Sequence, residues 1–336
     1  METRSEQIAV LLNANAKSVG RRTVDTIRET LPRAHTFLSR SRDDAQRHVD
    51  RIVHEDFGLV LCGGGDGSVV TLLNLLRRRA PRLPRLGLLK LGTGNAWARA
   101  MGARGLRWTL EQLQRRPIAE VPSDRFDLVE VEGMITHFTG AGWDARLVND
   151  FNDLVRGLGV KAGKSVAAYM TALFSKTVPA EALDFQRYGQ AEVQVETLGG
   201  DVVRVTRDGS EVPVTVEPGT VIHASPVSVI GCATTEHYGF GFKAFPYARR
   251  RARMFNFRAL NMSVGQAVVS IPALWRGTMT GEPITDYLVQ DIQVTFSRPL
   301  EFQVGGDAMG KRHQVRMRIA DESVDIVDFR RLAQMN

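Results

Sequence analysis

The chain has 336 residues, of which 43% are apolar and 24% are charged, so a globular core and two domains are expected. Its formal net charge of +7 favours anionic partners such as nucleotides, acidic lipid surfaces or nucleic acid, although a basic protein with a solvated surface fits equally well. The two cysteines, Cys62 and Cys232, exclude a disulfide framework, and no run reaches the roughly 18 apolar residues of a membrane span.

The first hundred residues alternate strand patterns with helical patterns. Strands are expected at residues 8–13, 35–38, 57–62 and 86–91. Helices are expected at residues 19–31, at residues 69–76 and from Ala96. Another helix is expected over Ala45, Val49, Ile52 and Val53, with Asp43 or Asp44 as its capping residue. Strands separated by helices predict a doubly wound, parallel α/β domain, in which ligands bind at the carboxyl ends of the strands.

The pattern changes after about residue 120, where short strands are separated by turn residues. These strands are expected at residues 127–131, 135–139, 191–198, 202–207, 212–216, 221–225, 291–296 and 315–319. They predict a mainly antiparallel β domain over residues 121–321, interrupted by a helical insertion at about residues 145–175. Residues 1–120 would form the α/β domain.

The strongest motif follows the expected strand at residues 57–62 and consists of Gly63, Gly64, Gly65, Asp66, Gly67 and Ser68. Glycines let backbone N–H groups approach a phosphate, and the following helix N-terminus adds a favourable partial charge. Asp66 would repel a phosphate, so its useful roles are to act through Mg²⁺ or to take a proton from an attacking hydroxyl. The alternative is a tight turn with a capping acid. The spacing fits neither the dinucleotide fingerprint nor the P-loop.

A second turn, made of Gly92, Thr93, Gly94 and Asn95, follows the next expected strand. Thr93 and Asn95 can donate hydrogen bonds to phosphate oxygens, or Asn95 can cap the next helix. Because the two turns end successive strands of one sheet, they would meet at one ligand, which favours a nucleotide site.

These two motifs, GGDGS at residues 64–68 and GTGNA at residues 92–96, resemble those of the diacylglycerol kinase catalytic-domain superfamily. That superfamily includes bacterial lipid kinases and sphingosine kinases and is distantly related to the NAD kinases. Weaker matches are Asn13 after the first strand, Ser39 before an Asp-Ala pair, Asp127 at the start of the second domain, and GWDA at residues 142–145.

The resemblance implies a nucleotide domain and a β-rich domain, with the chain end at residues 322–336 returning to the first domain. It implies that Asp66 is the base or an Mg²⁺-linked acid and that Asp127 belongs to the acidic network near the metal. It also implies that one group of residues borders ATP, namely Asn13, Ser39, Gly63, Gly64, Gly65, Gly67, Ser68, Gly92, Thr93 and Asn95.

The chain departs from the family at two acidic positions. Ala96 replaces one acid, and in VGGD at residues 304–307 Gly305 replaces another, with Asp307 where a glutamate is expected. If residues 300–308 form a strand running into a turn, side chains two apart share a face, and Asp307 would act as a secondary catalytic acid. Otherwise Asp66 acts alone, Asp307 is an ordinary turn residue, or the protein is inactive.

These observations predict a lipid kinase that transfers the γ-phosphoryl group of ATP, with Mg²⁺, to the hydroxyl of diacylglycerol, a sphingoid base or ceramide. The alternatives are an NAD-kinase-like activity on a soluble nucleotide and a catalytically inactive lipid- or nucleotide-binding protein. No motif supports nucleic-acid binding, and a homodimer is left open.

We expect a cytoplasmic protein in peripheral contact with the inner face of an anionic membrane, because it is basic and its N-terminus shows no secretory signal. The basic run at residues 249–253, beside Phe240, Phe242, Phe245 and Phe255, is either a docking surface or a solvated loop. The helical stripe of Tyr169, Met170, Leu173 and Phe174 is either core or the lip of a lipid entrance.

Overall fold

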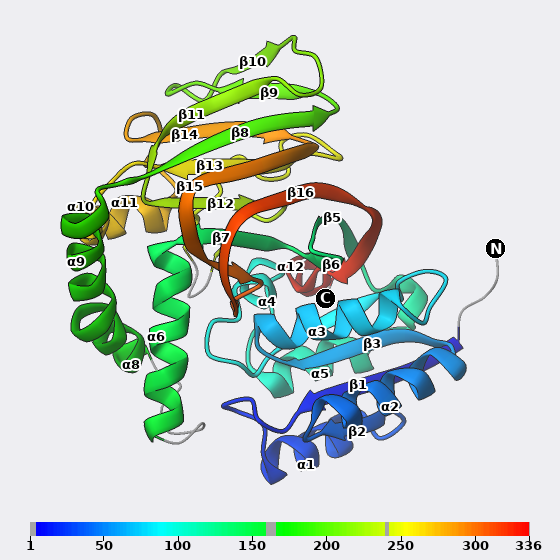
Figure 1. The fold of residues 1–336 in the computed structure, drawn as a ribbon. Coiled ribbons are helices and arrows are strands. Elements are labelled where there is room, and N and C mark those ends of the chain that lie inside the picture. The colour runs from blue at the N-terminus through cyan, green and yellow to red at the C-terminus, as the bar shows by residue number, and fades with distance from the viewer. Residues whose placement is uncertain (1–4, 159–165, 239–241, 336) are drawn as a thin grey trace. The chain divides into compact units, whose positions relative to one another are not determined.

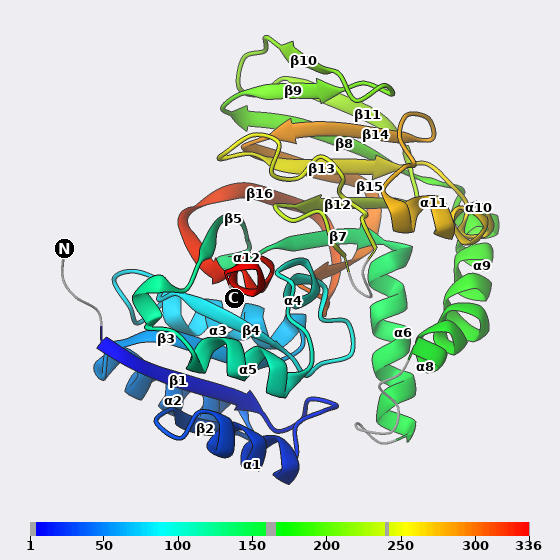
Figure 2. The ribbon, with the colours of Figure 1, turned by 180° about the vertical axis from the view of Figure 1, so that it is seen from behind.

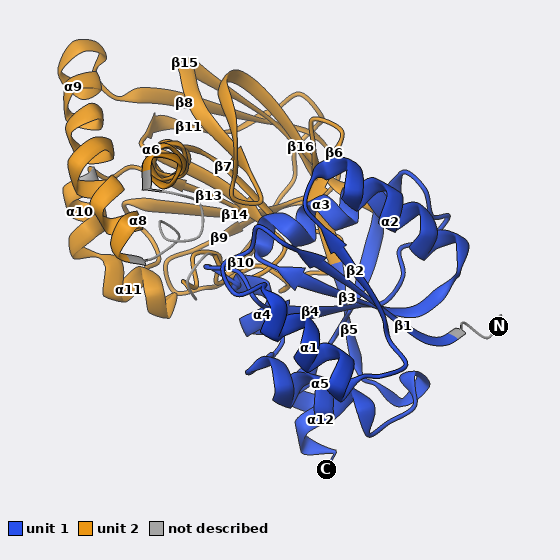
Figure 3. Cartoon of the chain, turned by 90° about the horizontal axis from the view of Figure 1, so that it is seen from below, with its two compact units in different colours: residues 1–126, 239–241, 322–336 blue, residues 127–238, 242–321 orange. Residues whose placement is uncertain are grey.

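The computed structural model describes residues 5–158, 166–238 and 242–335. The chain divides into two compact units, coloured in Figure 3. Unit 1 contains residues 1–126, 239–241 and 322–336, and unit 2 contains residues 127–238 and 242–321. The division falls after Phe126, a little beyond the change of pattern near residue 120, and the chain end belongs to unit 1.

Unit 1 is built on a parallel sheet with the strand order β4-β3-β1-β2 (Figures 1 and 2). Its strands are β1 (Ser5–Asn13), β2 (His35–Ser39), β3 (Phe57–Gly64) and β4 (Leu86–Lys90). Its helices are α1 (Arg21–Thr30), α2 (Arg42–His54), α3 (Asp66–Arg77), α4 (Ala96–Ala100), α5 (Leu106–Gln114) and the short 3₁₀ helix η1 (Ile118–Glu120). Every residue of β3 is buried, as expected for a central strand covered on both faces. The predicted doubly wound α/β domain is confirmed.

The N-terminus of α2 differs from the prediction that Asp43 or Asp44 caps it. Ser41 is the capping residue, and its hydroxyl accepts a hydrogen bond of 3.0 Å from the Asp44 amide. Asp43 and Asp44 lie in the first turn instead. Their carboxylates favour the positive end of the helix dipole from there, so the acidic pattern marked the right helix end but the wrong capping residue.

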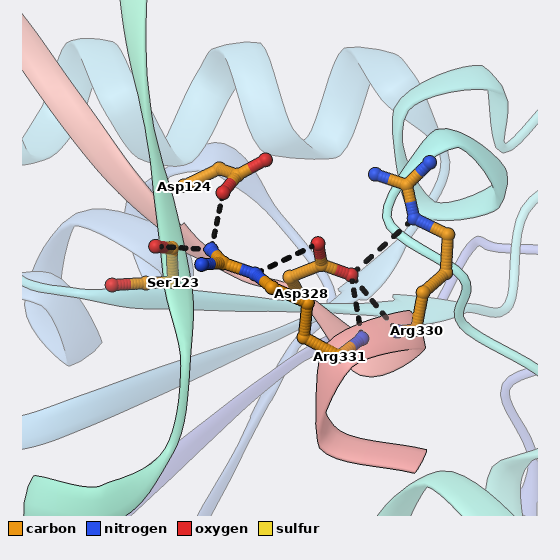
Figure 4. Close-up of polar contacts among 5 residues, drawn as sticks. All are labelled: Ser123, Asp124, Asp328, Arg330 and Arg331. Atoms are coloured by element: carbon orange, nitrogen blue, oxygen red, sulfur yellow. Dashed lines mark hydrogen bonds and ion pairs between the residues drawn. The ribbon is translucent and has the colours of Figure 1, made fainter. Parts of the chain in front are cut away.

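The chain end is attached to unit 1 through a strand and a short helix. At the end of β16 (Asp307–Val327), Ile326 pairs in parallel with Leu86 of β4, and α12 (Phe329–Gln334) follows. Figure 4 shows how Asp328 caps this helix, accepting hydrogen bonds from the amides of Arg330 (2.9 Å) and Arg331 (3.3 Å).

The side chain of Arg331 extends this attachment to β5 (Ser123–Val131). Its guanidinium donates to the carbonyl oxygen of Ser123 over 2.7 Å and pairs with the carboxylates of Asp124 and Asp328 (Figure 4). One buried carboxylate and one arginine therefore hold the last helix against an earlier part of unit 1.

Removing the Asp328 carboxylate should weaken this attachment in a pH-dependent way. Burial raises the pKa of Asp328, but hydrogen bonds from the Arg330 and Arg331 amides outweigh it and leave the pKa below its usual value. A lowered pKa stabilises the fold above the unfolded-state pKa, and this contribution is lost as pH falls through the folded-state pKa. We expect Asp328→Asn to lower the free energy of unfolding at pH 7 by about 1 kcal/mol.

Denaturant unfolding from pH 7 down to pH 3 measures this effect, and the deficit of Asp328→Asn should shrink below about pH 4. Asp321→Asn is the control, because its side chain is 82% exposed and its contact with Arg318 spans 3.8 Å. An equal loss in both variants would contradict the capping role.

Unit 2 is mainly antiparallel β-structure, as predicted. Its strands are β5 (Ser123–Val131, which begins in unit 1), β6 (Met134–Thr136), β7 (Phe138–Gly142), β8 (Ala191–Gly199), β9 (Val202–Val205), β10 (Glu211–Val214), β11 (Val221–Val227), β12 (Val229–Ala233), β13 (Phe255–Leu260), β14 (Ile284–Val289), β15 (Asp291–Val304) and the first part of β16. Seven strands follow the order β10-β9-β14-β13-β12-β7-β15, β8 joins β15 to β11, and β15 pairs with β16. Alternating apolar side chains of these strands form one large core.

Helices flank the strands of unit 2. They are α6 (Trp143–Leu158), α8 (Val166–Ala172), the π-helical turn η2 (Leu173–Thr177), α9 (Val178–Tyr188), α10 (Val264–Val269) and α11 (Ile271–Arg276). The helical insertion was predicted to end at residue 175, whereas the helices continue to Tyr188. Its part at residues 159–165 lies outside the described residues. No helix in the described part of the chain is long and apolar enough to cross a membrane.

Strands β12, β13 and β14 were not predicted from the sequence. In β13 and β14 the reason is that each strand contains a buried charged residue. Arg258 and Asp286 are each only 2% exposed and form a two-bond ion pair of 2.8 and 2.9 Å. The Asn256 amide donates to the same carboxylate over 3.0 Å. These polar residues interrupt the apolar pattern along the sequence, whereas in the sheet they satisfy one another.

Candidate functional site

The two glycine turns lie at the same edge of the unit 1 sheet. The first joins β3 to α3 and the second joins β4 to α4, and β3 and β4 pair in parallel up to Gly64 and Lys90. A Cβ atom on Gly92 would lie 2.2 Å from the Cα atom of Gly65, so the two backbones are in direct contact. The turns therefore meet, as the sequence predicted.

The glycines are needed for contact between protein atoms as well as for any ligand. A Cβ atom on Gly64 would lie 2.3 Å from the Ser68 hydroxyl oxygen, and one on Gly63 would lie 2.3 Å from a methyl group of Leu12. A larger residue at either position would therefore force the Leu12 or Ser68 side chain to move.

Gly92→Ala tests this close approach. The added methyl group would meet backbone atoms of Gly65, which cannot move aside as a flexible side chain can. We expect a loss of about 1–3 kcal/mol in the free energy of unfolding. The matched control is Gly105→Ala, because a Cβ atom at Gly105 meets nothing within 4 Å. Similar unfolding curves for the two variants would disprove the proposed constraint.

Asp66 joins the two turns. It is the first residue of α3, and its carboxylate accepts hydrogen bonds from the amides of Ala96 (3.0 Å) and Trp97 (3.2 Å) at the start of α4. Burial raises the pKa of Asp66, while these two amides and the charge of Arg99 oppose the increase. The carboxylate is thus held in place by two backbone donors and is more basic than an ordinary aspartate.

The Asn95 side chain bonds within its own turn, and contact of this residue with ATP stays a prediction. Its side chain closes its own turn, accepting from the Gly92 amide over 2.8 Å and donating to the Gly92 carbonyl over 2.6 Å. It makes no side-chain capping bond to α4, and its φ of 50° is left-handed. Asn95 occupies the N-cap position, but the alternative that its side chain caps the helix is wrong, because Asp66 binds the first amides of α4 instead.

Asn13 and Ser39 lie at the ends of β1 and β2, close to this edge. The Asn13 amide donates to the Ser68 hydroxyl over 3.0 Å, which connects the first strand to the glycine turn. The buried Ser39 hydroxyl donates to the Leu12 carbonyl over 3.1 Å. Asn13 therefore contacts the glycine turn, whereas Ser39 supports β1; contact of either residue with ATP stays a prediction.

Thr93 supplies a group that fits a phosphate oxygen. Its hydroxyl is buried and has no hydrogen-bond partner in the described part of the protein. It belongs to the same turn as Gly92, beside Gly65 and the start of α3. The first amides of a helix lack acceptors within the helix, and they favour anions. An unpartnered hydroxyl beside a helix N-terminus fits the triphosphate of ATP.

The residues that would bind a metal ion are less well defined than those that would bind phosphate. Among the described residues, no group of three or more His, Cys, Asp or Glu side chains could hold a metal ion. Asp127 belongs to unit 2, where its carboxylate accepts from the Arg253 amide over 2.7 Å and from its guanidinium over 3.3 Å. Mg²⁺ often needs only one or two carboxylates besides the substrate phosphates, so a role for Asp66 or Asp127 in binding it stays a prediction.

Asp307 lies at a tight hairpin in unit 2. Strand β15 ends at Val304, which pairs with Asp307 at the start of β16, and Gly305 and Gly306 form the turn with φ angles of 59° and 87°. Positive φ at both central residues is typical of a two-residue hairpin. The argument that residues 305 and 307 share a strand face is therefore wrong, because residue 305 is in the turn. A catalytic role for Asp307 stays a prediction.

The structure reveals a second polar cluster that sequence reasoning assigned no role. In unit 2, the Tyr238 hydroxyl donates to Asp144 Oδ2 over 3.2 Å, and the Gln303 amide donates to the same oxygen over 3.3 Å. Gln303 also accepts a 2.9 Å hydrogen bond from the Gly306 amide, which ties the hairpin to the cluster. Asp144 Oδ1 is buried and has no partner among the described residues. The GWDA motif marked this acid, but its partners are distant in sequence.

Asp144 should make stability depend on pH. Burial raises its pKa from 3.8 to about 6, against the hydrogen bonds it accepts. A raised folded-state pKa gives stability that is complete below the unfolded-state pKa and is lost as pH rises through the folded-state pKa. We expect the wild-type protein to lose stability relative to Asp144→Asn between about pH 4 and pH 6.

Urea unfolding of both proteins over this pH range gives the difference directly. Asp153→Asn is the control for removing a negative charge from the same helix, since Asp153 is 56% exposed and only 3.5 Å from Arg156. A constant difference between wild type and Asp144→Asn over the range would show that Asp144 does not titrate as described.

Comparison with known proteins agrees with the geometry of unit 1. Residues 7–129 match the family described as the diacylglycerol kinase catalytic domain. A probable YegS-like lipid kinase of Pseudomonas fluorescens (strain Pf0-1) is 32% identical over 118 residues, which cover 34% of this chain and 37% of the relative. A probable lipid kinase YegS of Salmonella arizonae is 34% identical over 97 residues, covering 27% and 32%. The chain thus matches only about a third of the length of these relatives.

Solved structures are similar along nearly the whole chain. A putative diacylglycerol kinase from Bacillus anthracis str. Sterne has a TM-score of 0.66 at 14% identity and covers 98% of this chain and 97% of its own. A second protein from the same strain, described as a diacylglycerol kinase, has a TM-score of 0.61 at 12% identity, covering 97% and 98%. At these identities the likeness shows the fold. The match over residues 7–129 confirms the resemblance inferred from the motifs, namely that this part of the chain is similar to the diacylglycerol kinase catalytic domain.

Proposed function

We propose that the protein is an ATP-dependent lipid kinase that transfers the γ-phosphoryl group of ATP to a lipid hydroxyl. The proposal rests mainly on Asp66, whose carboxylate is fixed where two glycine turns meet at the N-terminus of α3. Phosphoryl transfer requires positioning and charge stabilisation more than covalent chemistry by the protein. The names of the similar proteins, which are lipid kinases or diacylglycerol kinases, support the same reaction class.

Each element of the site has a role in this proposal. The amides of the glycine turn and the unpartnered Thr93 hydroxyl bind phosphate oxygens. The oxygen of the lipid hydroxyl attacks the γ-phosphorus, the bond from that phosphorus to ADP breaks, and Asp66 takes the hydroxyl proton. Because burial raises its pKa, Asp66 is a better proton acceptor than an exposed aspartate. Mg²⁺, bound through Asp66 or Asp127 and the phosphates, would neutralise charge on the transferring group.

Binding of nucleotide or lipid without catalysis is a second candidate function, and the hydrogen bonds of Asp66 favour it. Both oxygens of Asp66 already accept hydrogen bonds from the backbone of α4, which is the arrangement of a capping residue. If capping is its whole role, the protein binds nucleotide or lipid without catalysis. Labelled-ATP transfer to an unbiased lipid extract, with NAD as a parallel acceptor, separates a lipid kinase, an NAD-kinase-like enzyme and an inactive binding protein.

Asp66→Asn distinguishes catalysis from capping. Asparagine keeps one acceptor oxygen for the α4 amides but cannot take a proton, so we expect kcat to fall by a factor on the order of 10² to 10⁴. ATP affinity should change little, and the free energy of unfolding should fall by no more than about 1 kcal/mol. Turnover, equilibrium ATP binding and thermal unfolding measure the three effects.

Two further variants act as controls. Asn95→Gly keeps the left-handed backbone and removes the side chain that closes the second turn, so it perturbs the same loop without changing an acid. Asp307→Asn, measured beside Gly305→Asp, tests the secondary acid of the hairpin. Wild-type turnover in Asp66→Asn, together with a clear loss of stability, would leave capping as the role of Asp66.

A further inference from the structure

Helix α9 of unit 2 exposes apolar side chains that a soluble helix normally buries. None of its residues is buried. Leu183, Phe185 and Tyr188 are 52%, 63% and 64% exposed. A stable surface helix usually places its large apolar side chains against the core. The exposed side chains of α9 therefore form a candidate contact surface.

Neighbouring elements continue this surface. Phe174 in η2 is 53% exposed, Val269 in α10 is 83% exposed, and Trp275 in α11 is 46% exposed. The turn η2 leads directly into α9, and α10 contacts both α9 and α11. Figures 1 and 2 show these helices beside one another at one end of the strands of unit 2. We call five of these side chains the helical apolar face, namely Phe174, Phe185, Tyr188, Val269 and Trp275. Leu183 is left out, because residues two apart in a helix point to different sides.

The charges around this face are mainly positive toward solvent. The two acids of α9, Glu181 and Asp184, both pair with the largely buried Arg146 on α6. Three cations on the same elements, Lys176, Arg187 and Arg276, are exposed and make no ion pair with any residue that the structure describes. Apolar side chains interspersed with unpaired cations are complementary to an anionic lipid surface.

We propose that the helical apolar face docks on an anionic membrane, with the five apolar side chains entering the interface and the three cations contacting lipid headgroups. Trp275 and Tyr188 are residue types that favour the boundary between water and lipid. A second copy of the chain fits less well, because symmetric pairing would bring the same unpaired cations together. This docking does not depend on phosphoryl transfer.

The basic run at residues 249–253 is a weaker candidate than its sequence suggested. Its cations are engaged within unit 2, Arg250 and Arg251 with Glu211 and Arg253 with Asp127. Phe245 and Phe255 are buried, and Phe240 lies outside the described residues. Phe245 and Phe255 therefore cannot contact lipid beside this run without a change in the fold. The stripe on α8 and η2 is also mainly core, since Leu173 is buried and only Phe174 projects into solvent.

Vesicle co-sedimentation tests the apolar part of the proposal. The probes are vesicles of phosphatidylcholine alone and of phosphatidylcholine with phosphatidylglycerol, each at low and high salt. We expect the wild-type protein to bind the anionic vesicles, and Phe185→Ser/Val269→Ser/Trp275→Ser to lose about tenfold or more in partition coefficient. The matched control is Val212→Ser/Val221→Ser, which removes exposed apolar side chains from β10 and β11 and should bind as wild type does.

A charge series tests the cations. Lys176→Gln/Arg187→Gln/Arg276→Gln should lose about tenfold or more at low salt and retain little salt dependence. Arg21→Gln/Arg22→Gln/Arg33→Gln removes the same charge from exposed positions of unit 1 and should change binding much less. Equal losses in the two charge variants would overturn the assignment of this face, because net charge alone would then explain binding.

Two further results would also overturn it. One is wild-type protein that does not bind anionic vesicles. The other is sedimentation velocity showing a dimer that only the apolar variant dissociates, since the face would then pair two copies. Asp66→Asn should bind vesicles as wild type does, so failure of docking and failure of the proposed kinase activity remain distinguishable.

Discussion

The arrangement of unit 1 depends on the contact between its two glycine turns. The backbone of Gly92 approaches that of Gly65 so closely that no Cβ atom fits at residue 92. This contact brings the start of α4 under the Asp66 carboxylate, which then binds the amides of Ala96 and Trp97. The position of the acid and the direction of the turn that holds Thr93 are consequences of one steric constraint.

The same carboxylate serves both stability and chemistry in the proposed function. Two backbone donors fix Asp66 in orientation, and burial makes it more basic. An acid at a reacting centre benefits from both effects, because it needs no reorientation and accepts a proton more readily. A capping residue and a general base thus make compatible demands on this position.

Unit 2 uses buried polar groups in two ways. The Arg258–Asp286 ion pair is completed by Asn256 and lies wholly inside the sheet, so its charges are satisfied. In the cluster of Asp144, one carboxylate oxygen has no partner among the described residues, and the pKa rises to about 6. The first arrangement stabilises the packing of strands, whereas the second leaves an acid whose charge changes near neutral pH. Unit 2 also carries the exposed helical apolar face, whose proposed partner is a lipid surface.

The sequence by itself determined the order and class of most elements, because apolar periodicity and glycine-rich turns report local structure. It located both turns and Asp66, and it predicted that the turns meet. Only the tertiary structure decided that Asp66 rather than Asn95 binds the amides of α4, that Gly305 lies in a turn, and that Arg258 and Asp286 neutralise each other. These outcomes depend on partners distant along the chain, whose distances and burial no local pattern encodes. The apolar side chains of α9 illustrate the same limit, since helical spacing alone cannot tell a buried face from an exposed one.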